Sequence, residues 1–311
     1  IVFLDRATIA VDVPPPRFPH AWVDHAATRP DEVLARAAGA TLLVTNKVRL
    51  AGDVIERLDG LRMIAVAATG IDVVDIDACR RRGVVVTHAR GYAARSVAEH
   101  VLGVVLALRR RLVENVTLVR DGVWSRAPTF TLHRHAIEDV AGLALGIVGY
   151  GAIGRATAEL LAAVGARVLI AERRGEPARP GRVAFDEVLA SCDALSLHCP
   201  LSAATRGLVG RDEIARMRRG ALLVNTARGA LVDVSALVDA LRARHLGGAA
   251  LDVLDVEPPP EDHPALVAPP PNLLVTPHVA WASRSAQTEL ARQLVENLEA
   301  FVAGRPVRAV P

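Results

Sequence analysis

The stretch of this chain that most constrains its fold runs from Leu145 to Glu172. It reads as an apolar strand, the turn Gly149-Tyr-Gly-Ala-Ile-Gly154, a helical pattern and a second apolar strand that ends at Glu172. In such a βαβ unit the glycines permit a tight turn, let a pyrophosphate approach the backbone and let the helix pack closely on the strand. The helix N-terminus presents free N–H groups to phosphates. Glu172 stands near the spacing, roughly 20 residues, at which a carboxylate binds the adenosine ribose. The unit therefore predicts a dinucleotide site.

Apolar and helical segments alternate along the rest of the chain, which predicts α/β architecture with parallel sheets. The first 95 residues show this alternation without a glycine fingerprint of their own. A long helical pattern over 96–118, with Ser96 as its N-cap, opens the second domain. No strand follows the closing helical pattern over 284–303, so we expect it to return to the first domain. The predicted domains are residues 1–95 with 282–311, and residues 96–281.

Composition limits the classes of function. With 311 residues and 51% apolar content, the chain has enough material for two hydrophobic cores. No apolar stretch is long enough to cross a membrane and the start lacks the order of a signal peptide, so we expect a cytoplasmic protein without a membrane partner. The net charge of +3 does not favour nucleic acid, because the arginine clusters stand at helix ends. The three cysteines form no CxxC pair, so the sequence predicts neither a disulfide nor a zinc site. His133 and His135 have no other ligand type nearby, so we expect no metal site there.

Three ionisable residues follow predicted strands in the second half of the chain: Arg228, Glu257 and His278. A guanidinium binds a 2-oxo acid and polarises its keto oxygen, an imidazole passes a proton to that oxygen, and a carboxylate holds the imidazole. Taken singly, each residue also has a structural explanation: a solvated arginine, a glutamate in a proline turn and a histidine at a strand end. In the first domain, the backbone of Thr69 and Gly70 follows a strand and could hold a carboxylate, or form only a turn.

Four motifs together resemble a known family in their order and spacing. They are Gly149-Tyr-Gly-Ala-Ile-Gly154, Asn225-Thr-Ala-Arg-Gly229, the run from Gly248 through Asp252 to Glu257-Pro258, and Thr276-Pro-His278. This set is similar to that of the D-isomer-specific 2-hydroxyacid dehydrogenases, and the resemblance covers nearly the whole chain. Within the family, the segments AATGIDVVDID and HVAWASRSA are most similar to the glycerate dehydrogenase, or hydroxypyruvate reductase, branch.

The resemblance implies two Rossmann-like domains, with the cofactor domain inserted into a discontinuous flavodoxin-like substrate domain and the active site in the cleft between them. It implies a homodimer as the usual assembly. Arg228 matches the substrate-binding and catalytic arginine, His278 the general acid/base and Glu257 its partner, while Thr69 and Gly70 match the loop that binds the substrate carboxylate. The positions that match cofactor contacts are Gly149, Gly151, Ala152, Ile153, Gly154, Glu172, Arg173, Cys199, Pro200, Thr205, Thr226, Ala227, Asp252, His278 and Ala280. Among these, Asp252 matches the residue that helps hold the nicotinamide carboxamide.

The expected activity is hydride transfer between NAD(P)H and a small 2-oxo acid, with hydroxypyruvate/D-glycerate or glyoxylate/glycolate favoured. Glu257 disfavours formate, because the related formate dehydrogenases carry glutamine there. NAD is favoured because Glu172 repels a 2′-phosphate, while Arg173 and Arg174 keep NADP open as the alternative. A different class of function also stays open: a catalytically silent, NAD(H)-sensing binding protein similar to the transcriptional corepressors of the family.

Overall fold

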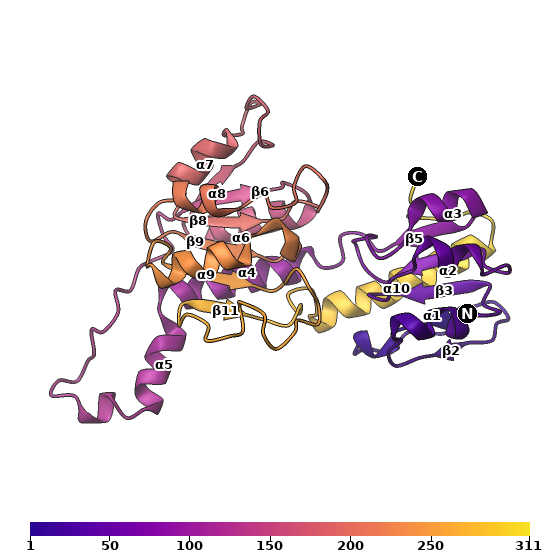
Figure 1. The fold of residues 1–311 in the computed structure, drawn as a ribbon, viewed down its shortest axis with the longest axis horizontal. Coiled ribbons are helices and arrows are strands. Elements are labelled where there is room, and N and C mark those ends of the chain that lie inside the picture. The colour runs from indigo at the N-terminus through magenta and orange to yellow at the C-terminus, as the bar shows by residue number, and fades with distance from the viewer. The chain divides into compact units, whose positions relative to one another are not determined.

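The chain folds into two compact units, and the computed structural model describes all residues from 1 to 311 (Figure 1). Unit 1 comprises Ile1–Ala93 and Ala282–Pro311, and unit 2 comprises Ala94–Trp281. Unit 1 is therefore discontinuous in sequence: its last helix, α10 (Arg284–Val302), packs against β4 and β5 from the first part of the chain. Both units contain a parallel sheet with helices, so the predicted fold class is confirmed.

Unit 1 is built on a five-stranded parallel sheet in the order β2-β1-β3-β4-β5. This 2-1-3-4-5 order is that of flavodoxin-like folds. Its strands are β1 (Val2–Phe3), β2 (Val23–Asp24), β3 (Leu42–Thr45), β4 (Met63–Val66) and β5 (Val85–His88). Its other helices are η1 (Arg6–Thr8), η2 (Pro30–Glu32), α1 (Val33–Ala37), α2 (Gly52–Glu56) and α3 (Ile76–Arg82). β3 and β4 are buried along their whole length, as expected for the central strands of a parallel sheet.

Unit 2 is built on a six-stranded parallel sheet in the order β11-β10-β9-β8-β6-β7. Its strands are β6 (Ala144–Val148), β7 (Arg167–Ile170), β8 (Ala194–Leu197), β9 (Leu222–Asn225), β10 (Gly248–Leu251) and β11 (Leu273–Val275). Its helices are α4 (Ala94–Arg109), α5 (Leu112–Arg120), η3 (Trp124–Arg126), α6 (Ala152–Ala163), α7 (Phe185–Ser191), α8 (Arg211–Arg216), η4 (Gly229–Leu231) and α9 (Val234–Arg242). The strand order reverses between β6 and β8, and such a switch point is where open α/β sheets bind ligands.

Three helices begin where the sequence supplies a capping side chain. Asp75, Asp233 and Ser283 each accept a hydrogen bond from the backbone N–H three residues on, at the N-termini of α3, α9 and α10. A cap of this kind is worth about 1 kcal/mol, because it satisfies an N–H group that the helix leaves unpaired. None of the helices, capped or not, is long and apolar enough to span a membrane.

The prediction of one helix over 96–118 is wrong, because the structure divides this segment. α4 ends at Arg109, Arg111 adopts a left-handed φ of 51°, and α5 begins at Leu112. The Arg111 guanidinium donates to the carbonyl of Gly247 at 3.0 Å, which ties the break to the sheet. α4 packs on α6, β9 and β10, whereas no residue of α5 is buried. Apolar residues continue at helical spacing through both helices, so the pattern alone could not show where the chain leaves the sheet.

Candidate active site

Three neighbouring strands of unit 2 end at the same edge of the sheet, and each leads to one of the ionisable residues predicted to do chemistry. β9 leads to Arg228, β10 to Glu257 and β11 to His278. Leu251, at the end of β10, pairs with the last residues of both β9 and β11. Parallel pairing therefore gathers segments that are far apart in the sequence at the carboxyl edge of the sheet.

The His278 imidazole is hydrogen-bonded to the Glu257 carboxylate. Nδ1 of His278 lies 2.6 Å from Oε2 of Glu257, and the other carboxylate oxygen accepts a hydrogen bond from the backbone N–H of Leu254 at 2.9 Å. The two side chains are 24% and 35% exposed, so the pair is accessible to a ligand. Because the carboxylate engages Nδ1, the ring is oriented and Nε2 is the nitrogen that can exchange a proton with a substrate.

The buried carboxylate of Asp252 holds the turn that carries His278. Oδ1 of Asp252 accepts hydrogen bonds from the Val279 N–H at 2.9 Å and the Thr276 hydroxyl at 2.5 Å. Oδ2 accepts one from the Ala280 N–H at 2.9 Å. His278 has a φ of 55°, a conformation that residues with a Cβ rarely adopt, so these bonds stabilise a costly turn. Asp252 thus positions His278, and its contact with the cofactor, like that of Ala280, stays a prediction.

Ser96 supports the same turn from α4. The sequence pattern predicts Ser96 as an N-cap, but the helix begins at Ala94 and Ser96 lies inside it. Its hydroxyl donates to the carbonyl of Ala280 at 2.7 Å. The serine therefore joins the end of the His278 turn to the helix rather than capping the helix.

Arg228 lies on a loop that packs against the loop of Glu257. The side-chain amide of Asn225, the last residue of β9, donates to the carbonyl of Arg228 at 2.8 Å. A Cβ at Gly229 would lie 1.9 Å from the carbonyl carbon of Leu254, so only glycine permits this approach of the two loops. The fold therefore places the backbone of the guanidinium-bearing loop directly beside the segment that carries the carboxylate.

The glycine turn between β6 and α6 offers a cradle for a pyrophosphate. A Cβ at Gly149 would meet the backbone nitrogen of Cys199 at 2.5 Å, and one at Gly154 would meet the carbonyl of Gly149 at 2.1 Å. By contrast, no atom lies within 4 Å of a Cβ built at Gly151, the N-cap of α6. No side chain caps this helix, whose first turn includes Ala152 and Ile153. Open space and uncapped N–H groups thus coincide, which fits the phosphates of a dinucleotide.

The other positions predicted to contact the cofactor follow β8 and β9. The Thr205 hydroxyl donates to the carbonyl of Pro200 at 2.8 Å, which closes the turn that begins at Cys199. The Thr226 hydroxyl is buried without a hydrogen-bond partner, and a bound ligand would satisfy it. The N–H of the next residue, Ala227, is held by Asn225 at 3.0 Å. The structure places all of these residues at the carboxyl edge, and their contacts with the cofactor remain predictions.

A second histidine at this edge is unsuited to acid catalysis near neutral pH. His198 follows β8, and its Nε2 lies 2.9 Å from the hydroxyl of Ser196. Burial lowers the pKa of His198 to about 4, because desolvation disfavours the charged ring. His198 is therefore neutral near pH 7.

In unit 1, Thr69 and Gly70 lie just beyond the carboxyl end of β4. The carbonyl of Thr69 is 2.8 Å from Nδ1 of His88, and Nε2 of His88 accepts a hydrogen bond from Arg90 at 2.7 Å. Burial lowers the pKa of His88, which favours the neutral ring that this arrangement requires. Sequence reasoning missed His88, although its place at the end of β5, beside β4, was a usable signal.

Comparison with known proteins gives the family. Residues 102–280 match the family profile described as D-isomer specific 2-hydroxyacid dehydrogenase, NAD binding domain. The chain belongs to this family. It is 42% identical over 311 residues to a glycerate dehydrogenase of Methylorubrum extorquens, covering 100% of this chain and 98% of the relative. It is 34% identical over 284 residues to a hydroxypyruvate reductase of Blautia hydrogenotrophica, covering 90% and 88%. The crystal structure of the TT0316 protein from Thermus thermophilus has 36% identity and a TM-score of 0.85, covering 100% and 99%.

These matches confirm the resemblance drawn from the four motifs. The chain is an NAD(P)-dependent oxidoreductase of the D-2-hydroxyacid dehydrogenase family, and its cofactor is NAD(H) or the phosphorylated form. Its relatives are named as dehydrogenases and reductases, so the alternative of a catalytically silent binding protein is not favoured.

One predicted cofactor residue of the dehydrogenase is buried. Glu172, directly beyond β7, is 1% exposed, and its carboxylate is bound by Arg179. Arg173, the next residue, has a side chain that is 77% exposed. The structure thus exposes the side chain of Arg173 and buries that of Glu172.

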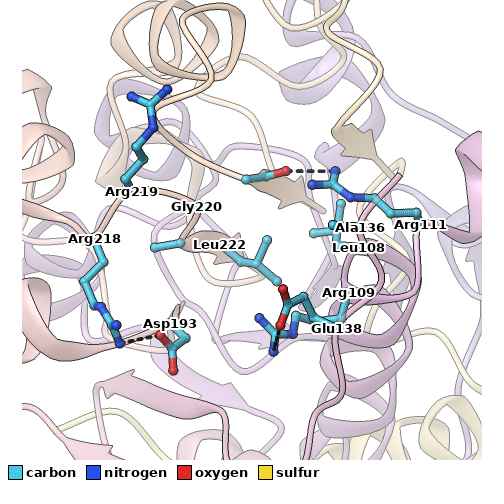
Figure 2. Close-up of a pocket in the computed structure, with 12 residues that line it drawn as sticks. Leu108, Arg109, Arg111, Ala136, Glu138, Asp193, Arg218, Arg219, Gly220 and Leu222 are labelled. Atoms are coloured by element: carbon cyan, nitrogen blue, oxygen red, sulfur yellow. Dashed lines mark hydrogen bonds and ion pairs between the residues drawn. The ribbon is translucent and has the colours of Figure 1, made fainter. Parts of the chain in front are cut away.

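A cavity of about 310 Å³ in the dehydrogenase lies at the other edge of the sheet, near the amino ends of β8, β9 and β10 (Figure 2). Three of the four arginines that line it are already paired: Arg218 lies 2.6 Å from Asp193, and Arg111 donates to a backbone carbonyl. Arg109 lies 3.5 Å from Glu138. Because open α/β sheets bind their ligands at the carboxyl ends of the strands, we do not assign this cavity to the reaction.

Proposed function

We propose that this chain reduces hydroxypyruvate to D-glycerate, or glyoxylate to glycolate, and catalyses the reverse oxidations. The proposal is supported above all by the 2.6 Å hydrogen bond between Glu257 and His278. The loop that carries Arg228 packs against the loop that carries Glu257. The substrate class is supported by the relatives, which are named glycerate dehydrogenase and hydroxypyruvate reductase.

The proposed roles follow from the chemistry of the side chains. Arg228 binds the carboxylate of the 2-oxo acid and polarises its keto oxygen. His278 donates a proton from Nε2 to that oxygen during reduction and removes it from the hydroxyl during oxidation. Glu257 orients the ring through Nδ1 and stabilises the imidazolium by its negative charge. The nicotinamide, when bound, supplies the hydride to C2 of the substrate.

The substrate carboxylate has a second proposed contact in unit 1. The backbone N–H groups of Thr69 and Gly70 are assigned to it, as the resemblance implies. The hydrogen bond between His88 and the carbonyl of Thr69 supports this assignment, because it fixes one side of the turn that carries these N–H groups.

A substrate panel tests the proposed function. The purified chain is mixed with NADH or NADPH and with glyoxylate, hydroxypyruvate, pyruvate or a bulkier 2-oxo acid, and absorbance at the nicotinamide band is followed. We expect the highest kcat/KM with hydroxypyruvate or glyoxylate. A clear preference for the bulkier acids would overturn the proposed substrate class, and no oxidation with any of the acids would overturn the proposed reaction.

We further propose that the protein is a homodimer that pairs through α5 and the segment that follows it. In Figure 1 these residues extend away from the rest of unit 2. Their apolar side chains are exposed: Val116 by 55%, Trp124 by 50% and Phe130 by 90%. A twofold contact would cover this face with the same face of a second copy. Light scattering should give the mass of a dimer for the wild type and of a monomer for Val116→Asp combined with Phe130→Asp; a monomeric wild type contradicts the proposal.

The cytoplasm is the proposed location. Cys79, Cys192 and Cys199 are all free thiols, and two of them are buried. Unpaired cysteines are typical of reducing compartments, which supports this assignment. Fractionation of the native host should find the protein with soluble cytoplasmic markers; recovery with an exported fraction would contradict it.

A further inference from the structure

The turn that follows β7 is organised around the carboxylate of Glu172. Oε2 accepts a hydrogen bond from Nε of Arg179 at 2.6 Å, and Oε1 accepts one from Nη2 of the same guanidinium at 2.7 Å. The backbone N–H of Arg173 donates to Oε1 at 2.9 Å, and that of Arg179 donates to Oε2 at 3.4 Å. Arg182 adds a further cation, 3.9 Å from Oε2. Each oxygen of the carboxylate therefore already accepts two hydrogen bonds.

This arrangement removes Glu172 from the set of groups that can bind a ribose. Its side chain is 0% exposed, and the bidentate guanidinium covers both oxygens. Ribose hydroxyls would have to replace charge-assisted bonds to Arg179 with neutral ones, which are about half as strong. The hydrogen bonds from Arg179 lower the pKa of Glu172 to about 2, so the carboxylate keeps its charge and its partner across the physiological range.

The surface of the turn is cationic. Residues 172–182 contain four arginines and two glutamates, and one of these glutamates is the buried Glu172. The side chains of Arg179 and Arg173 are 58% and 77% exposed. Arg173 has only a long contact of 3.7 Å with the exposed Glu176, which holds it weakly. Two guanidinium groups are thus presented next to the strand end where a dinucleotide places its adenosine ribose.

The position of the turn fits that ribose. β7 is the neighbour of β6, whose carboxyl end carries the glycine turn, and Ile147 pairs with Ile170. In dinucleotide folds, the residues that follow the second strand face the ribose, where a carboxylate selects the 2′-hydroxyl and an arginine accommodates a 2′-phosphate.

We propose that the turn after β7 is a 2′-phosphate site, so that the chain binds NADP(H) in preference to NAD(H). Arg173 and Arg179 contact the phosphate, and Glu172 is a positioning residue that holds Arg179. The inference rests on one part of the proposed function, the binding of the dinucleotide by the glycine turn. It also reverses the preference for NAD that the sequence favoured, because the carboxylate behind that preference is covered.

Direct binding tests the inference without any substrate. NADPH and NADH are titrated separately into the full chain, and nicotinamide fluorescence gives each Kd. We expect NADPH to bind at least about tenfold more tightly than NADH, as one or two charge-assisted hydrogen bonds would provide. Wild-type protein that binds NADH as tightly as NADPH, or more tightly, overturns the inference.

Arg179→Ala gives the sharper result, because it should move the two affinities in opposite directions. NADPH should bind about 10- to 100-fold more weakly, and NADH more tightly, since Glu172 is released to accept hydrogen bonds from the ribose. Equal weakening of both cofactors would mean that Arg179 only supports the fold of the turn, and would overturn the inference. Arg179→Lys, which keeps the charge, should retain part of the preference for NADPH even if the alanine variant is unstable.

Arg216→Ala is the matched control. Arg216 is 53% exposed and pairs with a single carboxylate, Asp186, at 3.2 Å, but it lies on α8 and outside the turn. Neither Kd should change in this variant; a loss of NADPH affinity as large as that of Arg179→Ala would show a general charge effect and overturn the inference. Tight NADPH binding without turnover of any 2-oxo acid would contradict the proposed function but would still support the 2′-phosphate site.

Discussion

Two glutamates at the carboxyl edge of the unit 2 sheet have basic partners at the same distance. They differ in their exposure to solvent and in whether the partner can lose its proton. Glu257 lies 2.6 Å from His278 and Glu172 lies 2.6 Å from Arg179. Glu257 is 35% exposed and meets a ring that can release its proton, whereas the side chain of Glu172 is 0% exposed and meets a guanidinium that stays charged. Exposure and the ability of the partner to titrate, rather than distance, separate the carboxylate proposed to assist chemistry from the one that organises a loop.

The largest expected effect comes from removing the titratable partner. His278→Ala should lower kcat by about 10²–10⁴, because it removes the positioned proton donor. The Kd for NADH or NADPH should change far less, since the proton donor acts on the substrate. Steady-state rates and fluorescence titration measure the two quantities. His135→Ala, at an exposed histidine outside the edge, is the control, and an unchanged kcat for His278→Ala would remove His278 from the mechanism.

Replacing the assisting carboxylate should cost less. Glu257→Gln keeps an oxygen for the N–H of Leu254 but loses the charge beside His278. We expect kcat to fall by on the order of 10- to 100-fold, the equivalent of one charge-assisted hydrogen bond of about 1.5–3 kcal/mol. Glu257→Asp should recover part of the rate if charge is the cause. Glu176→Gln, at an exposed glutamate, should not affect kcat; equal rates for Glu257→Gln and the wild type would show that the hydrogen bond is structural only.

The contrast between the two glutamates also marks the limit of what the sequence could predict. The carboxyl ends of parallel strands lie at the same edge of a sheet, so the order of the motifs was enough to place Arg228 and His278 at one edge. Four arginines follow Glu172 within ten residues, and only the folded turn determines that the side chain of Arg179 covers it. The break between α4 and α5 could not be predicted from the sequence either, because Arg111, at the break, is hydrogen-bonded to Gly247 in a distant part of the chain.

A third carboxylate shares features of both, since Asp252 is buried like Glu172 but holds the turn of His278, the partner of Glu257. Asp252→Ala leaves the N–H groups of Val279 and Ala280 without their acceptor. Each buried unsatisfied group costs about 1–3 kcal/mol, so the free energy of unfolding measured in urea should fall by at least about that amount. Rates should fall as well, because the turn that carries His278 loosens. Asp252→Asn, which keeps one acceptor oxygen, should lose less; equal stability of the alanine variant and the wild type would contradict the positioning role.

The smallest expected effect is the acid dependence of the Glu172 ion pair. The hydrogen bonds from Arg179 hold the pKa of Glu172 at about 2, below the usual value of about 4.3 for an unfolded chain. The folded state therefore binds this proton less readily than the unfolded state, so the pair stabilises the fold above about pH 4.3 and this stabilisation disappears as the pH falls toward 2. Glu172→Gln should lower Tm at pH 7, and the gap to the wild type should narrow through pH 4 and pH 3. Glu176→Gln, at a weakly paired and exposed glutamate, should track the wild type throughout. A gap for Glu172→Gln that stayed constant with pH would mean that packing of the side chain, rather than its charge, holds the turn.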